Sequence, residues 1–190
     1  VITDTANKTI LIGGFGLYND KTKESFATEY PLLMEHSRPD TIFLRADTIR
    51  TYTYHYGKKP VEPVLVDSLG APLDSLATIK ALAEADSINK ETEYHIAKAY
   101  NRARFYRNDL QGVADSITFV SRDSMMYLNR KPIIWSGQRQ VSGNIINVHF
   151  NDSTVDWAEL PDYGMMAEAV EEEFYNQMSG KKMKAYFHDQ

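Results

Sequence analysis

Histidine is a frequent metal ligand and acid-base group, and this sequence holds five histidines, each far from the others. None lies within four residues of another; they are His36, His55, His95, His149 and His188. Metal sites with a sequence signature place their ligands at short local spacings, which are absent here. We therefore predict no metal ion and no other cofactor, and we expect isolated histidines on strands or at the surface.

A glycine-rich segment, Gly13-Gly14-Phe15-Gly16, is the next candidate for chemistry. A phosphate-binding loop would continue into Lys and Ser or Thr and open a helix, and neither feature follows. Glycines within a strand more often mark a bulge or a close approach of two backbones. We expect that structural role for this segment.

Acidic residues could serve a glycoside hydrolase, which needs two carboxylates on either side of the scissile bond. Glu171-Glu172-Glu173 is the densest acidic run, but no second carboxylate is positioned against it by the sequence, so a solvated face is expected. The chain has no cysteine, which excludes disulfides, thiolate catalysis and cysteine-bound zinc. We predict that the protein is not an enzyme.

Composition describes a folded domain that does not bind nucleic acid. The 190 residues are 43% hydrophobic and 25% charged, which suits one domain with a single core or groove. The net charge of -5 opposes binding to phosphate backbones, and the densest basic run is only Lys181, Lys182 and Lys184. No apolar stretch reaches the roughly 20 residues of a membrane span. The chain begins with Val1, so we expect either a mature or a trimmed form, with any export signal not in view.

Strand-like runs rich in aromatic residues, threonine and isoleucine recur along most of the chain. Clusters of Asn, Asp, Gly and Pro separate them, as turns do. These features predict an all-β protein. The clearest runs cover residues 9–12, 41–56, 95–107, 115–121, 132–136, 144–150 and 181–187.

One segment departs from this rhythm. Residues 57–92 contain three prolines and then helix-like apolar spacing from Leu73 to Ala85, so we predict an insertion with a short helix. Residues 165–173 offer a second, weaker helical pattern, with a loop as the alternative. We predict one domain over residues 1–190 with the insertion at about 57–92.

An internal repeat gives the strands an order. Four short segments share a small residue, a short polar one, a variable one and a large apolar one; they are Ala27-Thr28-Glu29-Tyr30, Ala46-Asp47-Thr48-Ile49, Ala114-Asp115-Ser116-Ile117 and Gly143-Asn144-Ile145-Ile146. The strands before them also correspond: residues 30–34 match residues 131–135, and Arg104-Phe105-Tyr106 takes the equivalent place. We predict that one two-strand unit recurs.

Stacking these units aligns their side chains in columns. Strand side chains alternate between faces, so Ile49, Ile117 and Ile146 should form one inward column, and Thr51, Phe119 and Val148 the next. Arg50, Thr118 and Asn147 should point outward, while Ala97, Ala99 and Ala103 share the inner face. The prediction is a folded-over sheet, a jelly roll or taco, whose terminal strands lack partners.

The segment from Arg104 to Ile117 (RFYRNDLQGVADSI) resembles the OstA-like, or LptA-like, family of lipopolysaccharide transport proteins. Further similarities follow in order, at residues 121–124, at 131–136 (KPIIWS) with 143–145 (GNI), and at 175–181 (YNQMSGK). The resemblance covers residues 99–187 more closely than residues 9–54. The insertion and the absence of a visible signal sequence are departures from the family pattern.

This resemblance implies a β-jellyroll (β-taco) fold without catalytic residues and with a lipid-lined interior. It implies that the ligand is lipopolysaccharide, bound through its lipid A part. It also implies that the partners are other lipopolysaccharide transport proteins, and that the chain can form homo-oligomers through its edge strands. It also implies a periplasmic location, with association with the outer membrane as an extension. The expected groove residues are Ile49, Phe105, Ile117, Phe119, Ile134, Ile146 and Val148.

Two other functions stay open from the residues themselves. A periplasmic or surface β-sandwich that binds glycans or proteins would have a filled core and aromatic side chains outside. A hydrolase of surface polysaccharides would need a polar cleft with paired carboxylates. The interior decides between them, because transport needs apolar side chains around a channel that is open at an end.

Overall fold

The computed structural model describes residues 1–5, 7–36, 40–55, 93–108, 110–151, 154–171 and 174–187. The chain divides into two units, Val1–Tyr52 with His95–Gln190, and Thr53–Tyr94. In the second unit, Tyr54 stacks on Tyr94 with 5.4 Å between the ring centroids. The predicted insertion at 57–92 and its helix lie outside the described residues.

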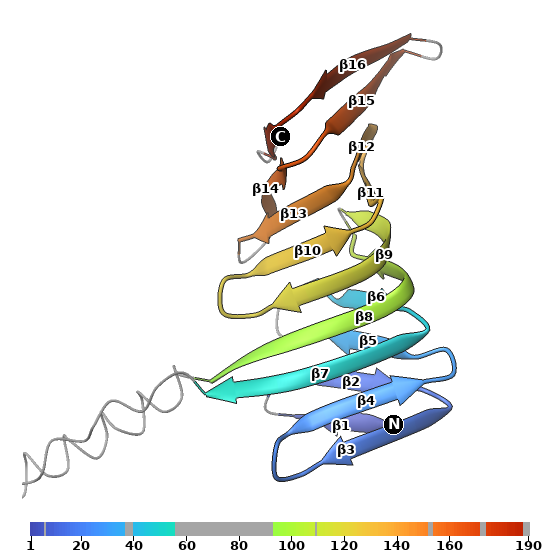
Figure 1. Cartoon of the computed structure of the whole chain (residues 1–190), viewed down its shortest axis with the longest axis vertical. Helices are drawn as coiled ribbons and strands as arrows, with labels where there is room; N and C mark the ends of the chain where they lie inside the picture. Colours follow the sequence, from blue (N-terminus) through green and yellow to red (C-terminus); the bar gives the residue numbers. More distant parts are fainter. Residues whose placement is uncertain are drawn as a thin grey trace, which may run out of the picture. The chain divides into compact units, whose positions relative to one another are not determined.

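The described residues form 17 β-strands and no helix, which confirms the all-β prediction (Figure 1). No described segment is therefore a helix that could cross a membrane. The strands are β1 Ile2–Asp4, β2 Thr9–Ile12, β3 Phe15–Asn19, β4 Glu24–Thr28, β5 Leu32–Glu35, β6 Ile42–Arg45, β7 Thr48–His55, β8 Glu93–Tyr106, β9 Gln111–Val120, β10 Met125–Asn129, β11 Ile133–Ser136, β12 Arg139–Gly143, β13 Ile145–Phe150, β14 Val155–Leu160, β15 Gly164–Glu171, β16 Phe174–Gly180 and β17 Met183–Tyr186.

In the first unit the strands build two layers of one folded-over antiparallel sheet. Layer 1 holds, in order, β3, β4, β7, β8, β9, β10, β13, β14 and β17. Layer 2 holds, in order, β1, β2, β5, β6, β8, β9, β11, β12, β15 and β16. The long strands β8 and β9 pass through both layers, so the sheet is continuous where it folds over (Figure 1).

Pairs of residues in the left-handed region turn the chain from layer 1 into layer 2. Glu29 and Tyr30 have φ of 59° and 60°, and Arg130 and Lys131 have φ of 63° and 57°. Asn101 and Arg102, at 60° and 52°, form the bulge that bends β8. Such φ values are costly for residues with a side chain, so their recurrence at equivalent positions marks a built-in corner.

The sequence repeat marks the corners of the reverse direction, where the chain passes from layer 2 back to layer 1. The copies at 46–49, 114–117 and 143–146 each place a small residue and then Asp or Asn at such a corner. The copy at 27–30 is different: Ala27 and Thr28 are the last two residues of layer 1 strand β4, and Tyr30 beyond them is 87% exposed. The repeat assignment was therefore wrong for this copy, because its small-polar pattern occurs at the other type of corner.

Polar side chains connect successive corners along the fold. Arg102 donates to Asp47 at 2.8 Å, and Arg130 donates to Asp115 at 3.2 Å. The hydrogen bond with Asp47, and then the charge of that carboxylate, raise the pKa of Arg102. These pairs are exposed, so their role is to hold corner geometry more than to add stability.

The predicted strand runs are found as strands in the structure, and the helix or loop expected at residues 165–173 is corrected to a strand. The run at 41–56 is split by the corner at Ala46 and Asp47 into β6 and β7. Residues 165–173, which offered a helical pattern or a loop, lie mostly in strand β15. Long-range pairing with β12 and β16 overrides the local helical preference there.

Candidate functional site

One column of inward side chains crosses the whole of layer 2. Each member lies directly opposite the next across paired strands, and directly opposite residues share a face. The central members are between 1% and 6% exposed. In order, the column contains Ile2, Leu11, Leu33, Leu44, Phe105, Gly112, Ile134, Val141, Met166 and Met178.

Layer 1 contributes two further inward columns, as the alternation predicts. Ile117, Leu128 and Ile146 lie opposite one another and are each 0% exposed. The adjacent column runs through Ala97, Phe119, Met126, Val148 and Ala158. Ile49 is also 0% exposed, and all seven expected groove residues belong to or pack against one apolar cluster.

Other residues of this cluster were not predicted from the sequence. Leu11 and Leu33 lie in the layer 2 column, and Leu128 lies between two predicted isoleucines in layer 1. The signal for them was the match between residues 30–34 and 131–135, because it places Leu33 in the same column as Ile134. Ala97, Ala99 and Ala103 face the interior as predicted and are 8%, 0% and 0% exposed.

Phe105, Gly112 and Ile134 show how closely the layer 2 column is packed. A Cβ atom on Gly112 would lie 2.5 Å from the Phe105 ring, 2.9 Å from Ile134 Cγ2 and 3.0 Å from the Ile133 carbonyl oxygen. Glycine therefore makes room for the aromatic ring over the strand. The family-like segment contains this glycine seven residues after Phe105 for a packing reason.

We expect Gly112→Ala to lower the free energy of unfolding by about 1–3 kcal/mol, the range for overpacking a core. Chemical denaturation followed by tryptophan fluorescence measures this loss. Gly16→Ala is the matched control, because a Cβ there meets its nearest neighbours at 3.6 and 3.7 Å. A Gly112→Ala protein as stable as the control would show that the Phe105 ring is not held over the strand.

The apolar interior becomes exposed at both ends of the stack of strands. At one end Tyr18, on the inward side of β3, is 50% exposed; at the other, Met178, on the inward side of β16, is 54% exposed. Strands β1, β3, β16 and β17 are terminal in their layers and pair on one side in the described part of the chain. The predicted unpartnered edges are thus present.

The two layers also touch on the side away from the corners. The Arg107 guanidinium lies 5.6 Å from the centre of the Phe150 ring. This contact joins the β8–β9 turn of layer 2 to β13 of layer 1. Arg107 is 1% exposed, and its Nη2 atom lies 3.8 Å from an Asp40 carboxylate oxygen. Side-chain contacts, and not continuous backbone, close this part of the interior.

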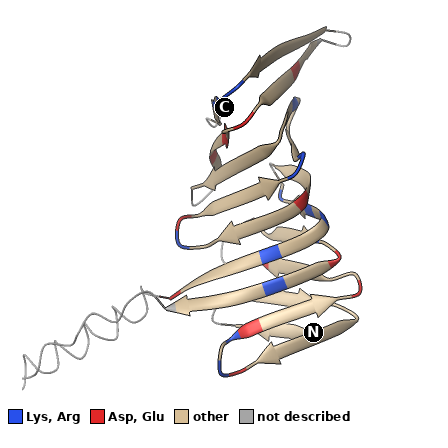
Figure 2. Ribbon diagram, in the orientation of Figure 1, with Lys and Arg blue, Asp and Glu red and all other residues tan. Residues whose placement is uncertain are grey.

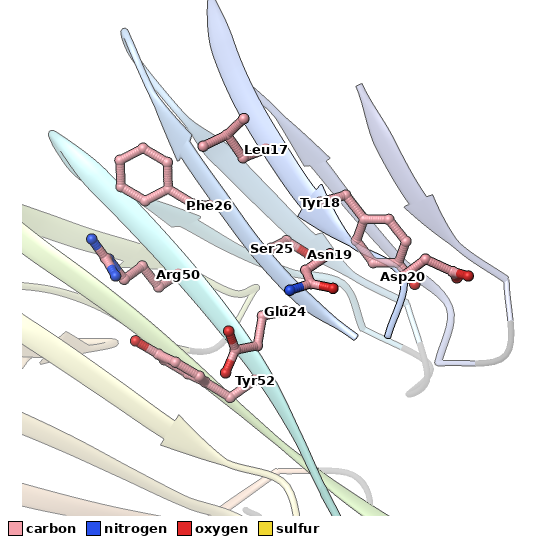
Figure 3. A pocket seen from close by; sticks show the side chains of 9 residues that line it. All are labelled: Leu17, Tyr18, Asn19, Asp20, Glu24, Ser25, Phe26, Arg50 and Tyr52. Atoms are coloured by element: carbon pink, nitrogen blue, oxygen red, sulfur yellow. The ribbon is translucent and has the colours of Figure 1, made fainter. Parts of the chain in front are cut away.

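A shallow surface pocket of about 430 Å³ lies at the β3 end (Figure 3). Arg50 and Tyr52 project into it from β7, and Glu24 and Phe26 from β4, with the Arg50 guanidinium 4.8 Å from the Phe26 ring centre. Asp20 lines the same pocket, and its carboxylate is paired with Lys23 at 2.7 Å. Among the described residues, no group of three or more His, Asp or Glu side chains could hold a metal ion.

The interior is thus largely apolar, with Arg107 as its buried charged residue in the described part of the chain. Charged residues lie at turns and corners and also along strands such as β7 and β8 (Figure 2). Burying hydrocarbon in such an interior is favourable by about 0.8 kcal/mol per methylene. The interior suits the binding of alkyl chains better than acid-base chemistry.

No family model matches the sequence, and no curated protein matches it significantly. Solved structures do match. One is LptH from Pseudomonas aeruginosa, described as the LptA-homologous periplasmic component of the conserved lipopolysaccharide transport device. The match covers 93% of this chain and 98% of LptH, with a TM-score of 0.50 and 8% sequence identity. The chain therefore has an LptA-like fold, as the resemblance of its sequence implied.

Proposed function

We propose that this protein binds lipopolysaccharide in the periplasm and passes it toward the outer membrane, without catalysing a reaction. The observation that carries the proposal is the inward apolar column that crosses all the strands of layer 2 and is exposed at its end. Lipid A carries several acyl chains that water excludes, and this column offers continuous cover for them. The LptA-like fold supports the same function.

The seven expected groove residues have a defined part in this proposal. One wall is in layer 1 and contains Ile49, Ile117 and Ile146. The opposite wall is in layer 2 and contains Phe105 and Ile134. Phe119 and Val148 also belong to layer 1 and lie farther from the corners than Ile117 and Ile146 do. These walls contact each other in the structure, so acyl chains enter as the layers part. Parting breaks side-chain contacts such as Arg107 on Phe150 and leaves the backbone corners intact.

The edge strands extend the interior into a partner. Layer 1 has nine strands in the described part of the chain, so β3 and β17 run in the same direction; layer 2 has ten, so β1 and β16 run in opposite directions. A second copy or a related transport protein that stacks end to end with its corners aligned pairs β17 with β3 in parallel and β16 with β1 in antiparallel fashion. Other lipopolysaccharide transport proteins with the same parity of strands are suitable partners.

A β-sandwich module with a filled core is the second candidate, and the near-complete burial of Ile117 and Ile146 favours it. Such a module would bind glycans or proteins on its outside and never admit lipid. The two functions predict different contacts for the same interior side chains in living cells. Crosslinking separates them.

We expect a benzophenone amino acid at Phe119 to crosslink lipopolysaccharide in cells, because this side chain faces the interior and is only partly buried. An aromatic probe replaces an aromatic residue there with little change in volume. The adduct is detected on gels with antibodies against the protein and against lipopolysaccharide. The matched control is Tyr127, whose two neighbours in β10 face inward while it faces outward.

A strong adduct at Phe119 with none at Tyr127 supports lipid transport. Equal labelling at both positions, or none at either in protein that folds and is exported, contradicts it and favours the filled-core module. Thr118 and Asn147, which also face outward, serve as further control positions.

A further inference from the structure

The outer face of layer 2 carries two arginines directly opposite each other. Arg45 of β6 pairs in register with Arg104 of β8, and both side chains are exposed. Neither makes an ion pair, hydrogen bond or ring contact with another described residue. Like charges at directly opposite positions destabilise a sheet, so the isolated protein gains nothing from this pair.

Apolar and aromatic side chains surround the two arginines. Phe43 and Tyr106 form the neighbouring cross-strand pair, with ring centroids 6.3 Å apart. Met34 lies next to Phe43 in that row, and on the other side Gln111 lies between Tyr106 and Trp135. Tyr106 is 49% exposed. We call the surface formed by Met34, Phe43, Arg45, Arg104, Tyr106 and Trp135 the arginine face.

Acidic residues are absent from the two outward rows to which the arginine face belongs, in the part of layer 2 that the structure describes. The chain as a whole has 26 acidic residues and a net charge of -5. The arginine face is therefore a local positive and apolar surface on an acidic protein. Its Coulomb field favours a partner with negative charge.

The composition of the arginine face distinguishes a protein partner from a membrane. Protein interfaces are enriched in Tyr, Trp, Phe, Met and Arg and depleted in Lys, Asp and Glu, which describes this surface residue type by residue type. Recruitment to anionic lipid usually takes clusters of about 4–8 basic residues, which is at least about twice the number of basic residues in the arginine face. Two arginines without a lysine are too few for that.

A second copy of this chain is also a poor occupant. A two-fold contact of this face with itself would bring the arginine pairs of both copies together, and like charges in an interface cost binding energy. We propose that the arginine face docks a different protein, one that presents one or two carboxylate side chains in the middle of an apolar surface. The proposal is independent of lipid binding in the interior.

The test places a benzophenone amino acid at Tyr106 of the full chain in its own cells, with Tyr127 on the outer face of layer 1 as the matched position. Any adduct is identified and its crosslinked segment mapped by mass spectrometry. The same experiment is repeated with Arg45→Glu and Arg104→Glu together. Thermal unfolding of the purified double variant checks that it folds, and we expect little change in stability, because the two substitutions exchange one exposed pair of like charges for another.

We expect one protein adduct at Tyr106 and none at Tyr127, with Asp or Glu in the mapped segment. Charge reversal of both arginines should reduce the adduct by about tenfold or more, and changing the mapped carboxylate to Lys should restore it in that background. The proposal would be overturned by an adduct whose yield is unchanged by charge reversal. An adduct between two copies of this chain, or the same adduct at Tyr127, would overturn it as well. Arginine-dependent flotation with vesicles of phosphatidylethanolamine and phosphatidylglycerol would also overturn it, in favour of a membrane.

Discussion

Ile146→Asp is expected to unfold the protein, or to lower its free energy of unfolding by about 4 kcal/mol or more. Ile146 is 0% exposed and lies opposite Leu128, in line with Ile117. A carboxylate there meets only hydrocarbon, and a buried charge without a partner is among the most destabilising changes in proteins. Urea denaturation followed by circular dichroism gives the free energy directly.

Asn147→Asp is the matched control, since it introduces the same side chain one position along β13. Asn147 lies opposite Tyr127 and Glu159 on the outer face. We expect a loss of at most about 1 kcal/mol, because the position is on the outer face and the new carboxylate lies directly opposite that of Glu159. Similar losses for the two variants would mean that β13 does not present alternate faces to the interior and to water, and the groove assignment would then fail with it.

This alternation is also the reason that much of the interior could be predicted from the sequence. In β13, and in β9 from Ile117 onward, large apolar residues occupy every second position, so one choice of phase fixes which side chains face inward. The match between residues 30–34 and 131–135 then ties distant strands to one column. Sequence alone therefore places Ile117, Ile146 and Ile134 on the inner face, and all three are at most 1% exposed in the structure.

The positions of the corners could not be predicted in the same way. The small-polar pattern occurs at corners of both directions, and it is the φ angles of residues such as Arg130 and Lys131 that distinguish them. No residue type in that pair requires a left-handed conformation, because neither is Gly, Asn or Asp. Strand β8 likewise continues through its corner at Asn101 and Arg102. No glycine or proline there marks the end of a strand in the sequence.

The edge strands β3 and β16 were the least visible elements in the sequence. Every residue of β3 is exposed, as is every residue of β16 except Gly180. Burial therefore imposes no alternation of apolar and polar residues on them, and alternation was the signal used for the other strands. Their location depends on backbone pairing with β4 and β15, which no local pattern encodes.

These exposed edges lead to the second large effect. A variant with Leu17→Cys and Lys184→Cys is expected to form a ladder of covalent multimers on oxidation. Both residues lie on the outer side of layer 1, Leu17 on terminal strand β3 and Lys184 on terminal strand β17. Leu17 comes three residues after the corner at Gly14, and Lys184 comes three residues after the corner at Lys181. Parallel pairing of β17 with β3 of the next copy brings them side by side, within the range of about 4.4–6.8 Å between Cα atoms that a disulfide spans. The natural chain has no cysteine, so no other disulfide competes.

Non-reducing gels of the oxidised protein measure the ladder, and the choice of pairs tests the direction of the strands. Asn19→Cys with Tyr186→Cys should crosslink as well, because parallel strands keep both pairs in step, whereas Leu17→Cys with Tyr186→Cys should remain monomeric. Leu17→Cys with Thr118→Cys is a control in which the second cysteine lies on the same face but in the middle of layer 1. Dimers from the single variant Lys184→Cys that equal the yield of the double variant would indicate tail-to-tail contact. In that case the interior would not continue from one copy to the next, and a chain of several copies could not carry lipid along it.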